Sequence, residues 1–581
     1  MSFLGVEHSL SGRRWLGPSI ETERSAEAMA QETGLPKPLC NVLARMGVDT
    51  PQAAKFLEPQ LRDLLPDPRS LRDMEKAAAR FLQAVNTGQR IAVFADYDVD
   101  GGASAALLIV WLRQMGLRTT LYIPDRIDEG YGPNPPAMAE LAGHHDLIIC
   151  VDCGTLSHDA LSAAKGADVI VLDHHLGGET LPPALAVVNP NRQDESSDLA
   201  HLCAASVVFL MLVEARRQLR EAGKSSPDLM AMLDLVALAT VADVAPLIGV
   251  NRALVRQGLK VMARRERVGL VALADVGRLD RAPESYHLGF VFGPRVNAGG
   301  RIGAADLGAR LLATDDPHEA AALAQRLDTL NTERRDIEAT VRAAALAQAE
   351  ERGLDGPLVW AAGEGWHPGV VGIVASRLKE ATNRPAIVIG LDGDEGKGSG
   401  RSVSGIDLGA AIQRLAQDGL LIKGGGHKMA AGLTVARDGV EDAMNRLSEL
   451  LARQGADRLG AADLRLDGVI MPGALTIETV TQMEDAGPFG ASAPAPRFAL
   501  PDMQVRFAKR VGENHLKLTL ADGMGGGMDA IAFGIADTPL GSALAARDGA
   551  RFHVAGRIEI NTWGGRQSLQ LRLEDAAQAD G

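Results

Sequence analysis

The stretch that most constrains the fold of this chain is Arg90–Gly102, with the sequence RIAVFADYDVDGG. Its apolar run predicts a buried β-strand, and Asp96, Asp98 and Asp100 follow directly. Like charges this close repel one another, so a folded protein keeps them together when something offsets the repulsion. A hard divalent cation with oxygen ligands is the usual solution. An acidic surface turn after a strand is the alternative.

Length and composition narrow the class of protein. A chain of 581 residues is too long for one core, and three or four domains are expected. The net charge of −14 argues against a surface coated in basic residues, although a basic groove can coexist with an acidic exterior. We find no secretory signal or apolar span, and the 4 cysteines are too few for a disulfide scaffold. We therefore expect a cytoplasmic protein that makes no use of a membrane.

After residue 90 the pattern alternates strands and helices. Strands are predicted at 119–123, 146–151 and 169–172, with helices at 103–115 and 156–165 between them. This alternation is typical of a doubly wound parallel sheet, where sites form at the carboxyl ends of the strands. Asp96, Asp152 and Asp173 each stand at such an end. The sequence therefore predicts an acidic site at one edge of the sheet.

A further acidic residue lies in the apolar segment Leu233–Val250, where Asp243 is the one charge in the interior. A buried carboxylate needs a cation, a metal or a proton. The alternative is a carboxylate at an exposed helix end.

Glycine-rich segments with basic side chains form a second kind of candidate site. We interpret Phe292–Gly303 as a loop whose Arg295, Asn297 and Arg301 hold substrate phosphate or brace the metal carboxylates. Three glycine-lined clusters at 365–368, 398–402 and 423–428 offer further phosphate donors, including Ser399, Arg401 and His427. Ordinary glycine turns remain the alternative for each cluster.

These patterns predict an α/β multidomain protein. We place a helical lead-in at 1–70, a doubly wound domain at 71–315, a long connecting helix at 316–352, a smaller α/β domain at 353–457 and a β-barrel at 458–581. Several short strands fit a small barrel of the oligonucleotide-binding type, and a generic barrel is the alternative. Its basic residues are Arg506, Lys509, Arg510 and Lys517.

The ordered set of motifs resembles the DHH phosphoesterase superfamily and, within it, the bacterial RecJ exonucleases. The motifs are DYDVDG at 96–101, VDCG at 151–154, DHH at 173–175, TVADV at 240–244, GPRVNAGGRI at 293–302, GSGRS at 398–402 and GGHKMAAG at 425–432. The resemblance implies a DHH domain, a DHH-associated domain and an oligonucleotide-binding barrel. It also implies 5′ to 3′ degradation of single-stranded DNA to mononucleotides in recombination and repair.

The resemblance further implies two Mn²⁺ or Mg²⁺ ions that clamp the scissile phosphate and activate a water. Asp152 would bridge the ions, Asp96 and Asp98 would complete one site, and Asp100, His174 and Asp243 the other. His175 would face the phosphate, with Asp173 orienting a histidine. Arg126, Ser399 and Arg401 resemble the family's pocket for a 5′-phosphate. Tyr131, Trp366 and Trp563 are candidate stacking platforms for bases.

Two other functions compete with this interpretation. One is a DHH phosphodiesterase acting on short oligoribonucleotides or cyclic dinucleotides, which needs no large C-terminal barrel. The other is an inactive scaffold of a replication complex, which predicts lost metal ligands, whereas every metal position here is filled. The expected partners are single-stranded DNA with a 5′ end, a single-strand-binding protein and a RecQ-type helicase, with association to the nucleoid during action.

Overall fold

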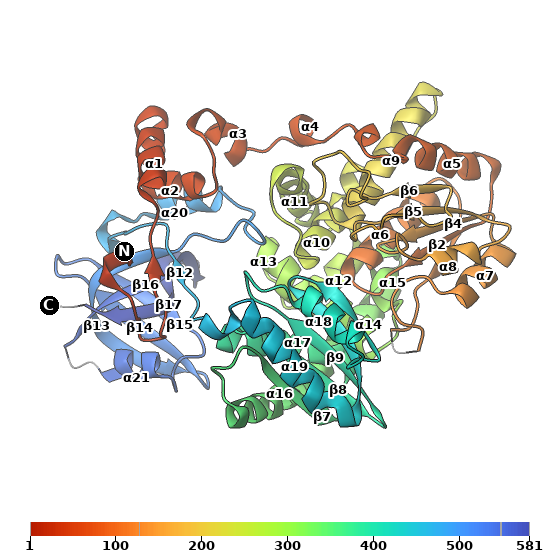
Figure 1. Ribbon diagram of the computed structural model, residues 1–581. Helices are drawn as coiled ribbons and strands as arrows, with labels where there is room; N and C mark the ends of the chain where they lie inside the picture. The colour runs from red at the N-terminus through yellow and green to blue at the C-terminus, as the bar shows by residue number, and fades with distance from the viewer. Residues whose placement is uncertain (1, 127, 547–548, 580–581) are drawn as a thin grey trace. The chain divides into compact units, whose positions relative to one another are not determined.

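The computed structural model describes residues 2–126, 128–546 and 549–579, and the chain forms two compact units (Figure 1). One unit is Leu64–Leu459, and the other joins Met1–Asp63 to Gly460–Gly581. The first unit contains two sheets linked by a long helix, and the second contains a closed barrel. Within the described ranges, no helix combines the length and apolar character that crossing a bilayer requires.

The predicted parallel sheet is confirmed. Its five strands are parallel and lie in the order β3-β2-β4-β5-β6. The strands are β2 (Ile91–Ala95), β3 (Thr119–Tyr122), β4 (Leu147–Val151), β5 (Asp168–Leu172) and β6 (Ala186–Val188). Every residue of β2 and β4 is buried, because helices cover both faces of the sheet.

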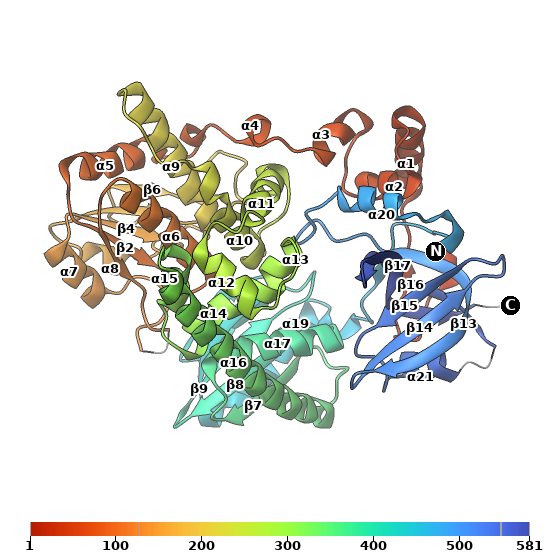
Figure 2. The same ribbon diagram turned by 180° about the vertical axis from the view of Figure 1, so that it is seen from behind.

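Helices from different parts of the chain cover the two faces (Figures 1 and 2). One face packs on α7 (Pro135–His144) and α8 (His158–Ser162). The other face packs on α5, α6 and α9, with further helices behind α6. These are α5 (Met74–Thr87), α6 (Val99–Gln114), α9 (Ala204–Glu221), α10 (Leu233–Ala242), α11 (Gly249–Met262), α12 (Val268–Val276) and α15 (Leu307–Ala313).

The glycine-rich segment after residue 292 is a helix, and our prediction of a loop there is wrong. α13 (Ser285–His287), a π-helical turn η5 (Leu288–Phe292) and α14 (Gly293–Ile302) follow one another without a break. The glycines serve close packing, since a Cβ at Gly300 would lie 2.6 Å from the carbonyl oxygen of Tyr97. The helix therefore presses against the loop that carries Asp96 and Asp98.

The long helix α16 (Pro317–Arg352) forms as predicted. Its N-cap is Asp316, whose side chain accepts a hydrogen bond of 2.8 Å from the backbone N–H of His318. The final turns of the helix, from Val341 on, belong to the core of the next domain. The helix therefore links two domains of the same unit.

The second sheet has the order β10-β11-β9-β8-β7, in which only β7 and β8 are parallel. Its strands are β7 (Val359–Glu364), β8 (Ala386–Asp392), β9 (Glu395–Arg401), β10 (Lys423–His427) and β11 (Ala430–Ala436). Its helices are α17 (Pro368–Thr382), α18 (Leu408–Gln417) and α19 (Val440–Arg453). This is the smaller α/β domain that the sequence predicts.

The C-terminal barrel is closed, with strand order β13-β14-β15-β17-β16. The strands are β13 (Phe498–Val511), β14 (His515–Ala521), β15 (Gly527–Ala532), β16 (Arg551–Trp563) and β17 (Arg566–Gln578), and α21 (Pro539–Ala546) lies between β15 and β16. Alternating apolar residues such as Leu516, Leu518 and Leu520 fill its interior.

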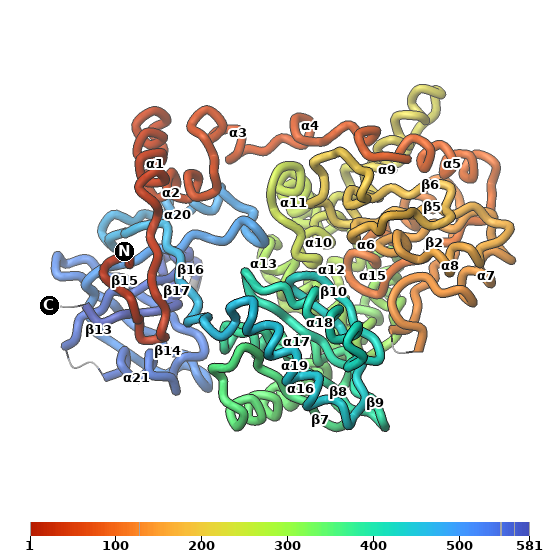
Figure 3. Tube along the Cα trace, in the orientation of Figure 1, coloured from red at the N-terminus to blue at the C-terminus, as the bar shows by residue number. Residues whose placement is uncertain are grey.

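The N-terminal segment packs with the barrel, an association that the sequence pattern does not indicate. β1 (Trp15–Leu16) pairs in parallel with β12 (Leu464–Arg465), and the buried Trp15 donates a hydrogen bond of 2.9 Å to Asp575. Figure 3 shows this red segment running beside the blue C-terminal strands. The helices of this region are α1 (Ile20–Thr33), α2 (Lys37–Arg45), α3 (Ala53–Leu57), α4 (Leu61–Leu64) and α20 (Ile477–Glu484). α1, α2 and α20 share one apolar core with the barrel.

Candidate functional site: an acidic centre beside an arginine cluster

The acidic site begins where β2 ends. Asp96 follows the strand, and Asp98 caps α6 by accepting hydrogen bonds from the backbone N–H groups of Asp100 and Gly101, at 2.8 and 3.2 Å. Glycine is required at position 101, because a Cβ there would lie 2.4 Å from the carbonyl oxygen of Asp96. The tight turn brings the three carboxylates of this loop together.

The other groups at this edge of the sheet follow β4 and β5. Asp152 follows β4 with φ of 60°, a left-handed conformation that strains a residue with a side chain. Asp173, His174 and His175 follow β5. Asp243 comes from outside the sheet, as the C-cap of α10.

These side chains form three overlapping groups, in each of which the possible ligand atoms lie within 4.8 Å of one another. The groups are Asp96 with Asp98 and Asp152; Asp100 with His174 and Asp243; and Asp152 with His174 and His175. His174 Nε2 lies 3.3 Å from Asp152 Oδ1 and 3.7 Å from Asp100 Oδ2. Asp152 and His174 therefore connect the two acidic groups.

Burial and mutual repulsion of the carboxylates favour bound cations at this centre. Burial, followed by the charge of Asp98, raises the pKa of Asp96 well above its ordinary value. Burial, followed by the charges of Asp100 and the other carboxylates, does the same for Asp152, and the pKa of Asp243 rises to about 9. Within the described parts of the chain, Asp96 Oδ1 and Asp152 Oδ1 are buried without a hydrogen-bond partner. Orphaned carboxylate oxygens in a crowd of like charges fit divalent metal ions.

Asp100 is oriented by a helix end. Both of its carboxylate oxygens accept hydrogen bonds, of 2.7 and 2.8 Å, from the backbone N–H groups of Ala204 and Ala205 at the start of α9. Partial positive charge at a helix N-terminus offsets part of the cost of burying this carboxylate.

Asp173 lies in none of the three groups and instead holds His175. It accepts hydrogen bonds from Thr155 N at 3.0 Å and from His175 Nδ1 at 2.8 Å. Burial alone would raise the pKa of Asp173, but these hydrogen bonds outweigh it and lower the pKa below the ordinary range. For His175 burial alone would lower the pKa, and the bond to Asp173 raises it. The carboxylate therefore stays ionised and favours a protonated imidazole.

Tyr131 completes this network together with two asparagines that the sequence patterns did not single out, Asn189 and Asn191. Tyr131, predicted as a stacking platform, uses its hydroxyl to donate to the carbonyl oxygen of Asp152 at 3.0 Å, and that hydroxyl also lies 3.1 Å from His175 Nδ1. Asn189 donates to the carbonyl oxygen of His175, and Asn191 to that of His174. The available signal was an Asn-Pro-Asn sequence at the carboxyl end of β6.

Arginines gather next to the acidic centre in the same unit. The Arg126 guanidinium lies 5.1 Å from the centre of the Tyr97 ring. Arg301 donates to the carbonyl oxygen of Gly369, and Arg401 to Gly400 O and to Ser399 Oγ. Among the described residues, none of the three arginines has a carboxylate within ion-pair distance.

Arg126 lies close enough to Arg301 and Arg401 for its charge to disfavour theirs. Burial, followed by the charge of Arg126, lowers the pKa of Arg301 to about 10, and the same two causes lower that of Arg401. Burial and Arg126 also lower the pKa of His367, the N-cap of α17, which places this histidine near the cluster. Half-buried guanidinium groups that have no acidic partner among the described residues fit an anion such as a phosphate.

Other predicted phosphate ligands lie elsewhere. Arg295 forms an ion pair of 2.8 Å with Asp328 of α16 and so braces two helices. The Oδ1 atom of Asn297 accepts a hydrogen bond of 3.0 Å from Val99 N, which supports the acidic loop. His427 is exposed on β10, and the strand register puts it on the same face as Arg401, two strands away.

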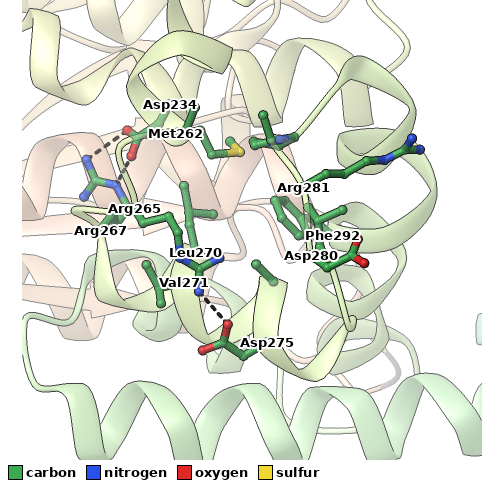
Figure 4. A pocket seen from close by; sticks show the side chains of 15 residues that line it. Asp234, Met262, Arg265, Arg267, Leu270, Val271, Asp275, Asp280, Arg281 and Phe292 are labelled. Carbon is green, nitrogen blue, oxygen red and sulfur yellow. Dashed lines mark hydrogen bonds and ion pairs between the residues drawn. The ribbon is translucent and has the colours of Figure 1, made fainter. Parts of the chain in front are cut away.

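A cavity of about 450 Å³ lies outside this site, around the ends of α11 and α12 (Figure 4). Its polar groups are largely engaged with one another, since Arg267 binds Asp234 at 2.7 Å and Arg265 binds Asp275 at 2.5 Å. Asp234 lies near the start of α10, about 13 Å along the helix from Asp243. The cavity therefore takes no part in the acidic centre.

Comparison with known proteins agrees with the fold. Family models match in chain order: the N-terminal domain of the DHH family at residues 90–240, the DHHA1 domain at 355–453 and the RecJ OB domain at 466–575. The fold, the acidic centre and these matches together define a hydrolase of the DHH superfamily.

Individual relatives cover nearly the whole chain. The single-stranded-DNA-specific exonuclease RecJ of Dickeya dadantii is 39% identical over 96% of this chain and 97% of its own length. The chain belongs to the RecJ family. Crystal structures of Thermus thermophilus RecJ in complex with Mn²⁺ and with Mg²⁺ match 98% of this chain, with TM-scores of 0.80 and 0.74, at 30% and 29% identity. The match covers 80% and 79% of those chains.

Proposed function

We propose that this chain is a metal-dependent exonuclease that degrades single-stranded DNA from the 5′ end and releases nucleoside 5′-monophosphates. The observation that carries the proposal is the pair of opposite charge clusters in one unit. Within the described residues, the carboxylates include oxygens without a hydrogen-bond partner, and the arginines have no acidic partner. The first suits the cations that a phosphodiester reaction requires, and the second suits a terminal phosphate. The relatives named single-stranded-DNA-specific exonuclease agree with this substrate.

The acidic centre offers ligands for two divalent cations, Mn²⁺ or Mg²⁺, the ions bound by the Thermus thermophilus relative. Asp96, Asp98 and Asp152 would hold one, and Asp100, His174 and Asp243 the other; Asp152, 3.3 Å from His174, would serve both. Such ions, when bound, withdraw charge from the scissile phosphate and lower the pKa of the attacking water.

The protein's own groups position the reaction. His175, whose Nδ1 is bonded to Asp173, can donate a hydrogen bond or a proton to an oxygen of the phosphate. The Tyr131 hydroxyl lies 3.1 Å from the same ring nitrogen, Nδ1, and 3.3 Å from Nε2. Tyr131 and Asp173 therefore fix one orientation of the donor.

The arginine cluster would set the direction in which the strand is degraded. A terminal phosphate carries more negative charge than an internal diester, and forked guanidinium groups bind it with charge-assisted hydrogen bonds. Arg126, Arg301 and Arg401 with Ser399 would hold the 5′-phosphate, and His427 would contact the strand near this pocket. With the 5′-phosphate held there, the first phosphodiester of the strand would lie at the acidic centre and react.

The partners and setting of the reaction belong to the same proposal. We infer action in the bacterial cytoplasm at the nucleoid, with a single-strand-binding protein and a RecQ-type helicase that supply the strand. The match of the C-terminal region to the RecJ OB domain favours DNA over the short oligoribonucleotides and cyclic dinucleotides of other DHH enzymes.

The test is a digest of single-stranded and duplex oligonucleotides labelled at either end, with and without Mn²⁺. We expect the 5′ label to appear first in a mononucleotide, only with the metal and only from the single strand. Early release of the 3′ label as a mononucleotide, or equal cleavage of a blunt duplex, would contradict the proposal.

A further inference from the structure

Two exposed aromatic rings lie stacked on the surface of the Leu64–Leu459 unit. Tyr286 is 51% exposed and Phe290 is 66% exposed. Their centroids are 4.8 Å apart and their planes differ by 24°. Leaving two large rings in water is costly, and such surface commonly marks a binding site.

The helix that carries this pair packs against the segment that ends in Asp243. A Cβ at Gly293 would lie 3.3 Å from the Cβ of Ala242, and one at Gly289 would lie 3.6 Å from Cγ1 of Val241. Phe290 is the immediate neighbour of Gly289. The backbone of this turn therefore packs against the end of α10, directly before Asp243.

Two further features mark this surface. Val244, directly after Asp243, is 69% exposed with φ of 59°, a conformation that β-branched residues rarely adopt. The turn that carries Phe290 is π-helical, and such insertions occur frequently at functional sites. Val244 adds an exposed apolar side chain directly after Asp243.

The same helix connects this surface with the acidic centre and the arginine cluster in a fixed order. Beyond Phe290 it reaches Asn297, which is bonded to the acidic loop, and then Arg301 of the arginine cluster. Phe290 and Arg301 are about 16 Å apart along the helix axis. A strand whose 5′-phosphate lies at Arg301 and whose first diester lies at the acids would continue toward Phe290.

We propose that Tyr286 and Phe290 form a stacking platform for the bases on the 3′ side of the scissile phosphate. This inference rests on the proposed function and deepens it. Every base has a π-face, so a platform of this kind accepts any sequence. It would hold bases that are splayed out of a helix, as they are in a single strand. The predicted platforms serve otherwise: Tyr131 bonds to His175, Trp366 packs against Gly363, and the side chain of Trp563 lies outside the described residues.

The test pairs protein variants with oligonucleotides that lack bases. Wild type and the double variant Tyr286→Ala/Phe290→Ala degrade a 5′-phosphorylated strand that is either intact or abasic at its second to fourth nucleotides. On the intact strand we expect the double variant to lose roughly tenfold or more in kcat/KM. On the abasic strand wild type should suffer the same loss, and the variant should lose nothing further, because both changes remove one interaction.

Matched variants separate stacking from general damage. Phe290→Trp should retain the preference for the intact strand, whereas Phe290→Leu should lose it, and Met230→Ala, which trims an exposed apolar side chain elsewhere, should change neither rate. Unchanged kcat/KM in the double variant, or equal losses on both strands, would overturn the platform. A wild type that degrades neither strand would instead refute the proposed function itself.

Discussion

The acidic centre and the arginine cluster are both crowds of like charge, yet the protein builds them differently. The acids follow neighbouring strands of one sheet, and only Asp243 comes from a separate helix. The arginines come from a loop after β3, from α14 and from β9, and backbone carbonyls hold two of them. The acids are thus placed by a single sheet, whereas the arginines meet only when two domains pack. We therefore expect that a substitution in one cluster impairs either the hydrolysis of the diester or the recognition of the 5′ end, and leaves the other intact.

The largest expected effect comes from breaking the acidic centre. Asp152→Asn preserves shape and tolerates the left-handed backbone, but it removes the carboxylate charge that belongs to the Asp96 group and lies 3.3 Å from His174 of the other. We expect the rate on single-stranded DNA to fall by at least about a thousandfold, as several kcal/mol of transition-state stabilisation are lost. Single-turnover assays in excess Mn²⁺ measure this, with the exposed Asp159→Asn as the control. Retention of more than about a tenth of the rate would contradict the metal assignment.

Breaking the arginine cluster should cost recognition and leave the chemistry. Arg401→Ala removes a charged hydrogen-bond donor that is typically worth about 1.5–3 kcal/mol, or roughly ten- to a hundredfold in binding. We expect the preference for 5′-phosphoryl over 5′-hydroxyl ends to shrink by this factor, measured as the ratio of kcat/KM values. Lys397→Ala, on the exposed part of the same strand, is the control. A wild type without preference, or a ratio that survives the change, would place the pocket elsewhere.

The barrel unit should increase the affinity for single-stranded DNA without changing the acidic centre or the arginine cluster. Because Met1–Asp63 shares a core with the barrel, a fair truncation keeps only residues 64–459. We expect this form to bind single-stranded DNA roughly tenfold more weakly, with a shallower salt dependence, since fewer phosphates are neutralised. Its kcat at saturating substrate should change little. Equal affinity and equal salt dependence would mean that the barrel does not bind the strand.

The smallest expected effect is on the pH dependence of thermal stability. It should arise from the carboxylates of the acidic centre and not from the arginine cluster. Without metal, raised pKa values let the folded state hold more protons than the unfolded state from about pH 4 up to about 9, the value for Asp243. Stability of the metal-free protein therefore falls as pH rises through this window. We expect the difference in Tm between Mg²⁺-loaded and chelated protein to grow by a few degrees between pH 5 and pH 9. Arg401→Ala should show the same growth, and a difference that is flat with pH would contradict the assignment.

The sequence predicted what depends on single elements. Asp96, Asp152 and Asp173 could be placed at one edge because the carboxyl ends of parallel strands coincide. Asp243 was indicated by its lone charge in an apolar run. The long helix, the parallel sheet and the barrel follow from periodicity alone.

What depends on packing between elements could not be predicted. Glycines after residue 292 suggested a loop, but they let a helix approach Tyr97 closely. Arg295 has the chemistry of a phosphate ligand, and only the packing of α14 on α16 directs it to Asp328. The bond from Val99 to Asn297 spans 198 residues and leaves no local pattern.

The hydrogen bond between Trp15 and Asp575 has a consequence for synthesis on the ribosome. The two residues are 560 positions apart, and at about 5–20 residues per second the first waits on the order of one minute for the second to emerge. The Leu64–Leu459 unit is translated in full within that interval. The apolar surfaces of α1 and α2 meanwhile have no barrel to cover them, so nascent chains should depend on chaperones at these helices until the barrel strands emerge.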